Sequence, residues 1–323
     1  MIRISIVGLG LIGASLGMAL RNADPAESAL GAVEVVGFDR DQQAVKEARG
    51  RLAIDREARS LAEAVRDAQL VVVATPVQAV REVFSQLATL LPAGAVVTDV
   101  ASTKAEVGRW AATLLPAGVA YVGGHPMAGK EQAGAAAADP ELFRGAIYCL
   151  TVGHNTPQPA LEAVEAMVRA LGAKPYYIDP EEHDAYVAAI SHLPMLLSVG
   201  LVEITGQSPA WKELAPLAAS GFRDVSRLAS GDPEMHRDIC LTNRQGLTRW
   251  IDAMVEFLLT VRAQIVAGDE AALEALLRRA KAQRDAWLET RPNVRPGEAA
   301  FEQRPEIERP NLLTFRLPNR RKD

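Results

Sequence analysis

A glycine-rich turn between a short strand and a helix constrains the fold of this chain more than any other feature. Residues 1–7 read MIRISIV, which alternates and then becomes continuously apolar, as a buried strand does. The turn GLGLIG follows at residues 8–13, and the next ten residues, ASLGMALRNA, have the composition of a helix. A second strand is expected at residues 33–38, directly before Asp39. This order of strand, GxGxxG, helix, strand and acidic residue predicts a dinucleotide-binding unit.

Each position of the turn has a physical role in binding a dinucleotide. Gly8 makes the tight turn, Gly10 lets the backbone approach the pyrophosphate, and Gly13 lets helix and strand pack closely. The helix then starts with Leu11 and Ile12 in its first turn. The N-terminus of this helix offers free N–H groups and a partial positive charge to the phosphates.

Residues after two of the strands complete the predicted cofactor site. Asp39 is expected to accept hydrogen bonds from the adenosine ribose and to repel a 2′-phosphate, which favours NAD over NADP. Arg40 keeps NADP open, because an arginine at this place can accommodate that phosphate. Thr75 and Pro76 leave the end of an apolar strand at residues 70–74, where ligands bind in such sheets.

Strands and helices alternate as far as residue 179, and the continuous apolar strands indicate a parallel sheet covered on both faces. Residues 180–290 show helical patterns, including one long amphipathic helix expected over 236–267. The expected fold is therefore α/β, with a Rossmann-type, doubly wound domain over 1–179 followed by an all-helical domain over 180–290. Residues 291–323 hold five prolines and little periodicity, which predicts an extended or disordered tail.

Composition argues against several classes of protein. The net charge of −5 disfavours a nucleic-acid partner. The two cysteines lie far apart and the five histidines are scattered, so neither a disulfide framework nor a metal site is predicted. The N-terminus lacks the basic region of a signal peptide, so a cytoplasmic location is the expectation. The apolar run Ala185–Val202 approaches the length of a membrane span, but polar residues near its middle favour a helix buried within a domain or between subunits.

The sequence VGGHPMAGKE, from Val122 to Glu131, presents a histidine after a strand expected at 120–122. Two glycines let the backbone pass close to a ligand, and Pro126 biases His125 toward an extended conformation. A catalytic histidine and a histidine that only bonds its own loop are equally compatible with these residues alone. Ser102 lies at another strand end, where capping the next helix and contacting a ligand are both open.

Six motifs in this order resemble those of the prephenate/arogenate (cyclohexadienyl) dehydrogenases of tyrosine biosynthesis: GLGLIGASLG, VVVATP, VTDVASTK, GGHPMAGKEQAG, HDAYVAAISHLP and SGFRDVSRLASGDP. The resemblance covers roughly residues 1–290. It implies a Rossmann domain, a helical domain that forms a homodimer, and a small-molecule substrate. The implied reaction is the NAD(P)-dependent oxidative decarboxylation of prephenate to 4-hydroxyphenylpyruvate, or of arogenate to tyrosine.

The resemblance also assigns roles to particular residues. His125 matches the general base, which suits a neutral imidazole. Ser102 matches a serine that hydrogen-bonds the substrate hydroxyl, and Arg227 an arginine that grips a substrate carboxylate. A surface ion pair with Asp224 is the alternative for this arginine. Asp224 and Glu131 match acidic positions of a gating ion network beside it.

His192 lies in the apolar helix two residues before Pro194, which is expected to kink that helix. A role in binding substrate and a role as a satisfied core histidine are both open for it. Met195 stands where many prephenate-preferring members have a second histidine, so the use of arogenate, or of both substrates, is also open. Two other functions compete with this one: a two-domain NAD(P)-dependent dehydrogenase of the β-hydroxyacid or imine-reductase type, and a non-catalytic NAD-binding sensor.

Overall fold

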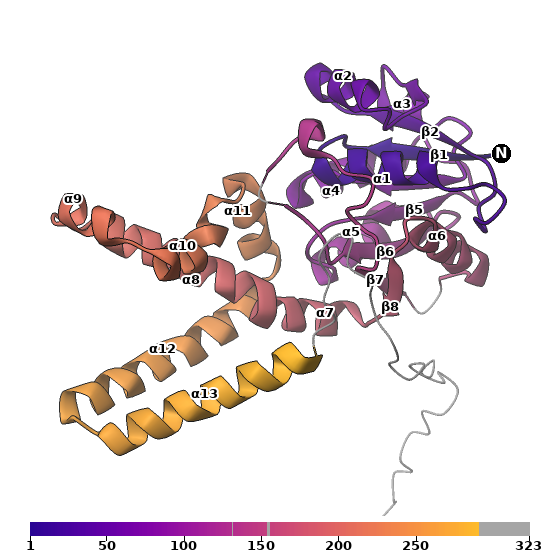
Figure 1. Ribbon diagram of the computed structural model, residues 1–323. Helices are drawn as coiled ribbons and strands as arrows, with labels where there is room; N and C mark the ends of the chain where they lie inside the picture. The colour runs from indigo at the N-terminus through magenta and orange to yellow at the C-terminus, as the bar shows by residue number, and fades with distance from the viewer. Residues whose placement is uncertain (131, 154–155, 291–323) are drawn as a thin grey trace, which may run out of the picture.

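The computed structural model describes residues 1–130, 132–153 and 156–290, which form a nucleotide-binding part and a helical part (Figure 1). The tail at 291–323 lies outside the described residues, so its predicted extended or disordered character stays a prediction.

A single sheet of eight strands forms the core of the first part, in the order β3-β2-β1-β4-β5-β6-β7-β8. The strand order reverses beside β1. The carboxyl ends of β1 and β4 therefore define the crevice where doubly wound sheets bind ligands. The strands are β1 (Ile2–Val7), β2 (Val33–Phe38), β3 (Arg56–Glu57), β4 (Leu70–Val73), β5 (Val96–Asp99), β6 (Ala120–Pro126), β7 (Ile147–Val152) and β8 (Lys174–Tyr177).

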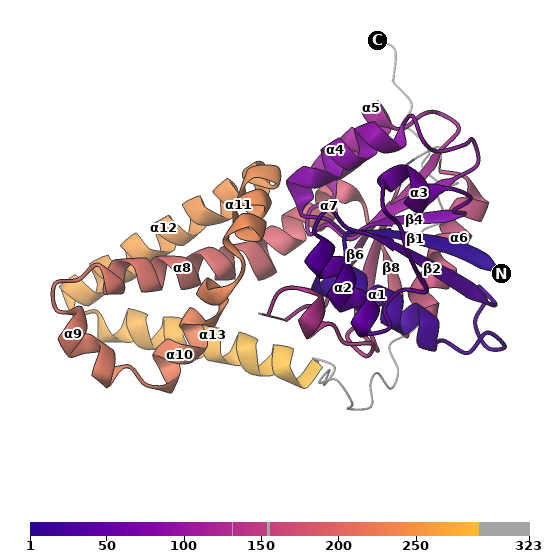
Figure 2. The same ribbon diagram turned by 90° about the horizontal axis from the view of Figure 1, so that it is seen from above.

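Helices cover both faces of this sheet, because its strands are apolar on both sides. Side chains of α1, α2 and α6 join one buried cluster, and those of α3, α4 and α5 join a second cluster on the opposite face. Figure 2 shows α4 and α5 on one side of the strands and α1 and α2 on the other. The bounds are α1 (Leu11–Asn22), α2 (Gln42–Gly50), α3 (Leu61–Val65), α4 (Val77–Leu87), α5 (Ala105–Leu114) and α6 (Gln158–Ala170), with a short 3-10 turn η1 (Ala135–Ala137).

The predicted Rossmann-type sheet is confirmed, with one difference in direction. Strand β7 runs antiparallel to β6, and β8 runs parallel to β7, so the last two strands oppose the first six. Strand β6 is also longer than expected, because it continues through the two glycines and His125 to Pro126. His125 therefore lies within the strand, opposite Cys149 of β7, and not in a turn beyond it.

The second part consists of helices that begin at Asp179, whose side chain accepts hydrogen bonds from the N–H groups of Glu181 and Glu182. Its elements are α7 (Pro180–Val187), a π-helical turn η2 (Ala188–His192), α8 (Leu193–Gly206), α9 (Trp211–Leu214), η3 (Ala215–Leu217), α10 (Ser220–Ser226), η4 (Arg227–Ser230), α11 (Pro233–Thr242), α12 (Arg244–Ala267) and α13 (Glu270–Thr290). The π-helical turn ends at His192, two residues before Pro194. It lies close to the predicted kink, because proline cannot donate the hydrogen bond of a regular helix.

The single helix expected over 236–267 is wrong, since α11 and α12 are separate helices. Asn243 joins them with φ −120° and ψ 44°, which interrupts the helical backbone. Its side chain donates hydrogen bonds elsewhere in the fold, to the carbonyl of Asp184 and to His192. A tertiary contact thus breaks a helix that the apolar periodicity alone would continue.

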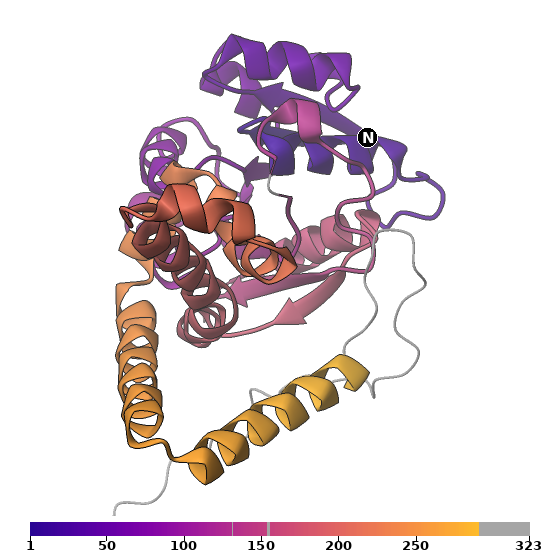
Figure 3. The ribbon, with the colours of Figure 1, turned by 60° about the vertical axis from the view of Figure 1, so that its left-hand side comes forward.

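The helical part leaves much apolar surface uncovered. In the described part of the chain α13 buries no residue and α12 buries only Leu247. Figure 3 shows α13, in yellow, turning away from the other helices after its junction with α12. Exposed large apolar side chains on α8, α12 and α13 include Leu197, Val199, Val202, Ile204, Trp250, Val255, Phe257, Leu258, Leu259, Ile265, Val266, Leu277, Trp287 and Leu288.

One continuous helical stretch, Pro180–Gly206, is long and apolar enough to cross a membrane by length and composition alone. Its mean hydropathy is 1.8 over the most apolar window, of which a third is buried. Core and interface helices of globular proteins pass the same test, so the predicted absence of a membrane span stays a prediction.

Candidate active site

The glycine turn has the geometry that a bound dinucleotide requires. Gly8 has φ +99°, and a Cβ on it would lie 2.5 Å from the carbonyl oxygen of Ala74. A Cβ on Gly13 would lie 1.9 Å from the carbonyl oxygen of Gly8, so only glycine lets α1 pack so closely on β1. A Cβ on Gly10 would meet nothing within 4 Å. The backbone at Gly10 therefore faces open space, into which a pyrophosphate can approach.

The N-terminus of α1 has no side chain to cap it and no acidic residue in its first turn, which holds Leu11 and Ile12. Its N–H groups and the helix dipole are consequently available to an anion. Across the crevice, the hydroxyl of Thr75 is buried and has no hydrogen-bond partner among the described residues. Pro76, beside it, is exposed and precedes α4.

Asp39 directly follows β2 and is fixed by its own loop. Its Oδ2 accepts a hydrogen bond from the N–H of Leu9 at 2.7 Å, and its Oδ1 accepts one from Asp41 at 2.9 Å. Each carboxylate oxygen can accept a further bond, so the side chain can still bind a ribose hydroxyl. Arg40 is exposed beside it. The residues of this crevice thus fit a dinucleotide.

His125 is presented from β6 as part of a chain of three side chains. Its Nδ1 lies 2.9 Å from Nε2 of His183, and Nδ1 of His183 lies 2.8 Å from Oδ1 of Asp184. His183 and Asp184 come from α7 and are buried, whereas His125 is partly exposed. The histidine of the sheet is therefore oriented by two residues of the helical part.

Asp184 also binds the nucleotide-binding part directly. Its Oδ1 accepts from the N–H of Lys104 at 2.7 Å, and its Oδ2 accepts from Ala105 at 3.0 Å. These N–H groups begin α5, which has no side-chain cap of its own. The carboxylate therefore takes the place of an N-cap, which is a stabilising position for a negative charge.

A buried ion pair lies behind His125. Lys104 and Asp99 are both fully buried, and the ammonium group of Lys104 donates to the Asp99 carboxylate and to the carbonyl oxygen of Gly124. Asp99 also accepts from Tyr121 Oη at 2.7 Å and from the N–H of Gly124 at 3.3 Å. This network fixes the ends of β5 and β6 against one another.

The surroundings of His125 keep its imidazole neutral. Burial is the main cause that holds the pKa of His125 well below 6.5, and His183, Lys104 and His192 lower it further. A neutral imidazole can accept a proton, as a general base must.

His192 is buried at the end of the π-helical turn. Its Nδ1 lies 3.2 Å from Nδ2 of Asn243, which acts as the donor if His192 is neutral. Burial lowers the pKa of His192 to about 4. His192 is therefore a buried histidine with a hydrogen-bond partner. Binding of substrate by His192 stays a prediction.

Comparison with known proteins assigns the family. Residues 26–177 match the model of the nucleotide-binding domain of prephenate dehydrogenase, and residues 179–279 match that of its dimerization domain. The prephenate dehydrogenase of Bacillus subtilis (strain 168) is 35% identical over 288 residues, which cover 87% of this chain and 75% of that protein. This chain belongs to the prephenate dehydrogenase family. The family predicted from the sequence motifs is thereby confirmed.

Two solved structures of similar proteins extend over the same region. Arogenate dehydrogenase from Synechocystis is 31% identical, with a TM-score of 0.73 over 88% of this chain and all of that one. Prephenate dehydrogenase from A. aeolicus, in complex with hydroxyphenyl propionate and NAD+, is 28% identical, with a TM-score of 0.81 over 88% of this chain and 98% of that one. The prephenate dehydrogenase fold thus spans both parts of this chain.

The remaining residues predicted from the family motifs fall in two regions. Ser102 lies three residues after the end of β5, and its hydroxyl makes no hydrogen bond within the described part of the chain. It does not cap α5, because the N-cap position is Lys104. Arg227 begins η4, which packs against α8 in the helical part. Asp224 pairs with Arg223 at 3.2 Å, and Glu131 lies outside the described residues.

Sequence reasoning missed His183 and Asp184 as site residues. Both belong to the family motif HDAYVAAISHLP, but polar residues at this place are also what an ordinary helix start contains. The available signal was a histidine next to a carboxylate in the acidic start of a helix that continues into the apolar run Ala185–Val202.

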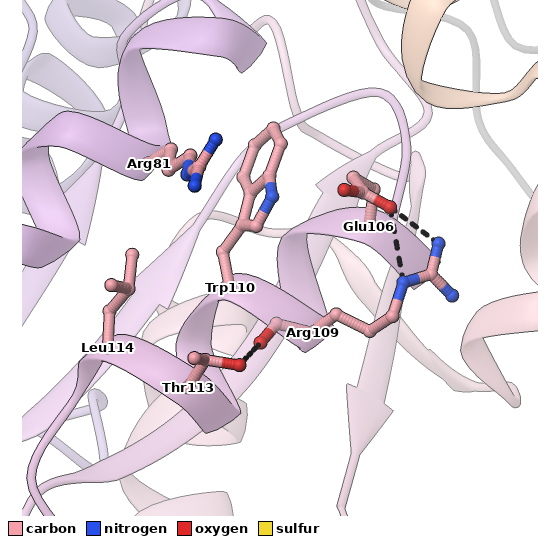
Figure 4. A pocket seen from close by; sticks show the side chains of 6 residues that line it. All are labelled: Arg81, Glu106, Arg109, Trp110, Thr113 and Leu114. Carbon is pink, nitrogen blue, oxygen red and sulfur yellow. Dashed lines mark hydrogen bonds and ion pairs between the residues drawn. The ribbon is translucent and has the colours of Figure 1, made fainter.

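A hollow of about 270 Å³ lies elsewhere, on the outer surface of α4 and α5 (Figure 4). The indole of Trp110 lies between Arg81 and Glu106, and Glu106 binds the guanidinium of Arg109. None of the lining residues belongs to the predicted site, and the charged groups partly satisfy one another. Within the described residues no cluster of three or more histidine, cysteine, aspartate or glutamate side chains has the arrangement of a metal site.

Proposed function

We propose that this protein oxidises and decarboxylates prephenate, arogenate or both, using NAD and His125 as the general base. The observation that carries the proposal is the position of His125. It is a partly exposed, neutral histidine near the end of β6, at the edge where β1 and β4 form the dinucleotide crevice.

The substrates are cyclohexadienols with a ring carboxylate opposite the hydroxyl. A bound nicotinamide supplies the hydride acceptor. His125 Nε2, the ring nitrogen that does not face His183, accepts the hydroxyl proton as the carbinol carbon is oxidised. Loss of the ring carboxylate as carbon dioxide then gives an aromatic ring, which makes the reaction essentially irreversible.

Two further side chains position the substrate in this proposal. Ser102, whose hydroxyl has no partner among the described residues, binds the substrate hydroxyl. Arg227 binds a substrate carboxylate, for which the planar guanidinium fork is suited. Gating by Asp224 and Glu131 rests on the family motifs alone.

NAD is proposed over NADP because Asp39 presents a carboxylate to the ribose. That carboxylate is fixed by two backbone N–H groups, so it cannot easily turn away from a 2′-phosphate. The exposed Arg40 is the residue that would reverse this preference. Met195, which is buried three residues after His192, is compatible with the use of arogenate.

The uncovered apolar faces of α8, α12 and α13 support a homodimer through the helical part. A second copy of the chain would bury these side chains from water, at about 25 cal/mol for each Å² of apolar surface. The same burial accounts for the apolar stretch Pro180–Gly206 without a membrane, and a cytoplasmic enzyme remains our proposal.

The test is a steady-state assay with purified protein, NAD or NADP, and prephenate or arogenate, followed by the absorbance of the reduced cofactor. Turnover of at least one substrate is expected, with NAD preferred. His125→Asn should bind NAD as the wild type does and lose roughly 10²–10⁴-fold in kcat, because general-base catalysis contributes that much. Absence of turnover with both substrates would refute the proposed function and favour an NAD-binding sensor. Unchanged kcat in His125→Asn would refute the role of the histidine alone.

A further inference from the structure

The order of protons along His125, His183 and Asp184 follows from the donors that surround the carboxylate. An ionised carboxylate only accepts hydrogen bonds. Asp184 already receives the N–H groups of Lys104 and Ala105 at the start of α5. It therefore accepts a third bond from Nδ1 of His183, 2.8 Å away, so this nitrogen carries a proton.

This assignment determines the next two ring nitrogens. A neutral imidazole has one donor and one acceptor, so Nε2 of neutral His183 must accept. Nδ1 of His125, 2.9 Å from it, must then donate. Neutral His125 is left with its lone pair on Nε2, the nitrogen that faces away from His183. That is the tautomer a general base requires.

The same carboxylate holds the two parts of the chain together. Asp184 belongs to α7, yet it caps α5 of the nucleotide-binding part. Two further contacts cross the same boundary, Thr103 Oγ1 to Thr242 Oγ1 at 2.9 Å and Gln78 N–H to Asp238 Oδ2 at 3.1 Å. Within the helical part, Asn243 Nδ2 donates to the Asp184 carbonyl oxygen at 2.7 Å and orients Asp184.

We propose that His183 and Asp184 are positioning residues that fix the reactive tautomer of His125 and make it depend on docking of the helical part. If α7 moves away from α5, Asp184 loses the two N–H groups that fix it, and His183 loses its position against His125. The imidazole of His125 is then free to adopt either tautomer. The kinetic consequence rests on the proposed function, whereas the tautomer itself does not.

The first experiment measures the tautomer directly. Nitrogen-15 labelling of the histidine rings in the full-length protein gives signals from only five histidines, and the His125→Asn spectrum identifies the signal of His125. The wild type, without substrate, should show a protonated Nδ1 and an unprotonated Nε2 at His125. A proton on Nε2 of the neutral ring would overturn the proposal, whatever reaction the protein catalyses.

The second experiment separates positioning from packing. His183→Leu removes the acceptor for His125 Nδ1–H and should lower kcat by about 10²-fold or more, with the KM for NAD within about threefold of wild type. His183→Gln keeps an amide oxygen that can accept this bond, and should recover at least tenfold of the loss. Equal kcat in the two variants would overturn the proposal, because a merely structural histidine would not distinguish them.

Asp184→Asn tests the coupling to docking. The groups that face the Asp184 carboxylate are all donors, so the NH₂ group of an asparagine would meet another donor there. The substitution should lower kcat and give His125 a mixture of the two tautomers in the nitrogen spectrum. Glu182→Gln is the matched control, a carboxyl-to-amide change in the same helix; among the described residues the Glu182 side chain bonds only Tyr186. It should leave both kcat and the His125 signals unchanged. If Asp184→Asn behaves like this control, the carboxylate has no positioning role.

Discussion

Replacing Lys104 with methionine removes the cation from an ion pair that is fully buried. Breaking a buried pair by removing one partner costs about 3–5 kcal/mol, because the other charge stays behind uncompensated. Asp99 would retain three donors, from Ala101 at 2.9 Å, Tyr121 at 2.7 Å and Gly124 at 3.3 Å. We therefore expect the lower end of this range, a loss of about 3 kcal/mol in the free energy of unfolding.

Urea denaturation followed by circular dichroism, at one fixed protein concentration, measures this loss. The same change corresponds to a decrease in Tm of about 6–12 °C for a domain of this size. Combining Lys104→Met with Asp99→Asn removes the stranded charge and should recover about 1–2 kcal/mol.

Lys281→Met is the matched control, because Lys281 forms an exposed ion pair with Asp285 within α13. Its expected cost is under about 0.5 kcal/mol. A Lys104→Met protein as stable as this control would refute the reasoning, since it would mean that water or a rearranged strand end compensates Asp99.

Two further predictions concern the cofactor crevice and His192. Gly10→Ala should keep the Tm of the wild type, because the added Cβ meets no protein atom within 4 Å. It should weaken NAD binding at least tenfold in a fluorescence titration, because the Cβ would clash with a bound pyrophosphate. Gly13→Ala should instead lower the Tm, since its Cβ meets the Gly8 carbonyl oxygen at 1.9 Å. Equal Tm values for the two would count against this distinction. The pKa of His192 is about 4 in the folded state, below the value of 6.5 in the unfolded state. Between these two pH values the unfolded state binds more protons than the folded state. The free energy of unfolding therefore falls as the pH drops from 6.5 to 4. The loss in the free energy of unfolding from this histidine should approach about 3 kcal/mol and be absent in His192→Gln. Urea denaturation of both proteins at pH 7 and pH 4.5 measures it. The same loss in the wild type and in His192→Gln would contradict the prediction.

Local patterns predicted much of the fold. Strand β2 has the predicted limits, because it is an apolar run bounded by turn residues. Strand β6 was predicted too short, since Gly123 and Gly124 have little intrinsic preference for strands. Pairing with β7 extends it through both glycines. Tertiary pairing here overrides local propensity.

The direction of β7 could not be read from its own residues. A strand has the same apolar pattern in either direction, and only the connection differs. A parallel crossover usually contains a helix, whereas the described residues of the segment 127–146 contain only the 3-10 turn η1 as a helical element. The weak helical pattern of this segment was the one usable signal for an antiparallel return.

The site was predicted as far as single residues and missed as an arrangement. His125 and Ser102 stand out because glycine and strand-end positions expose them. His183 and Asp184 act through contacts between α7 and the sheet, which no spacing along the chain encodes. The contacts of Asp184 with the start of α5 join residues 79 and 80 positions apart in sequence.

The uncovered faces of α12 and α13 have a consequence for how the chain acquires its structure. A pair of helices with one buried residue between them gains little stability from its own chain. In a dimer these helices become ordered by association, so their share of the folding free energy rises with protein concentration. Dilution would then act on α12 and α13 as a denaturant does, while the sheet stays folded. In such a dimer the cooperative folding unit of this half of the molecule would be the pair of chains.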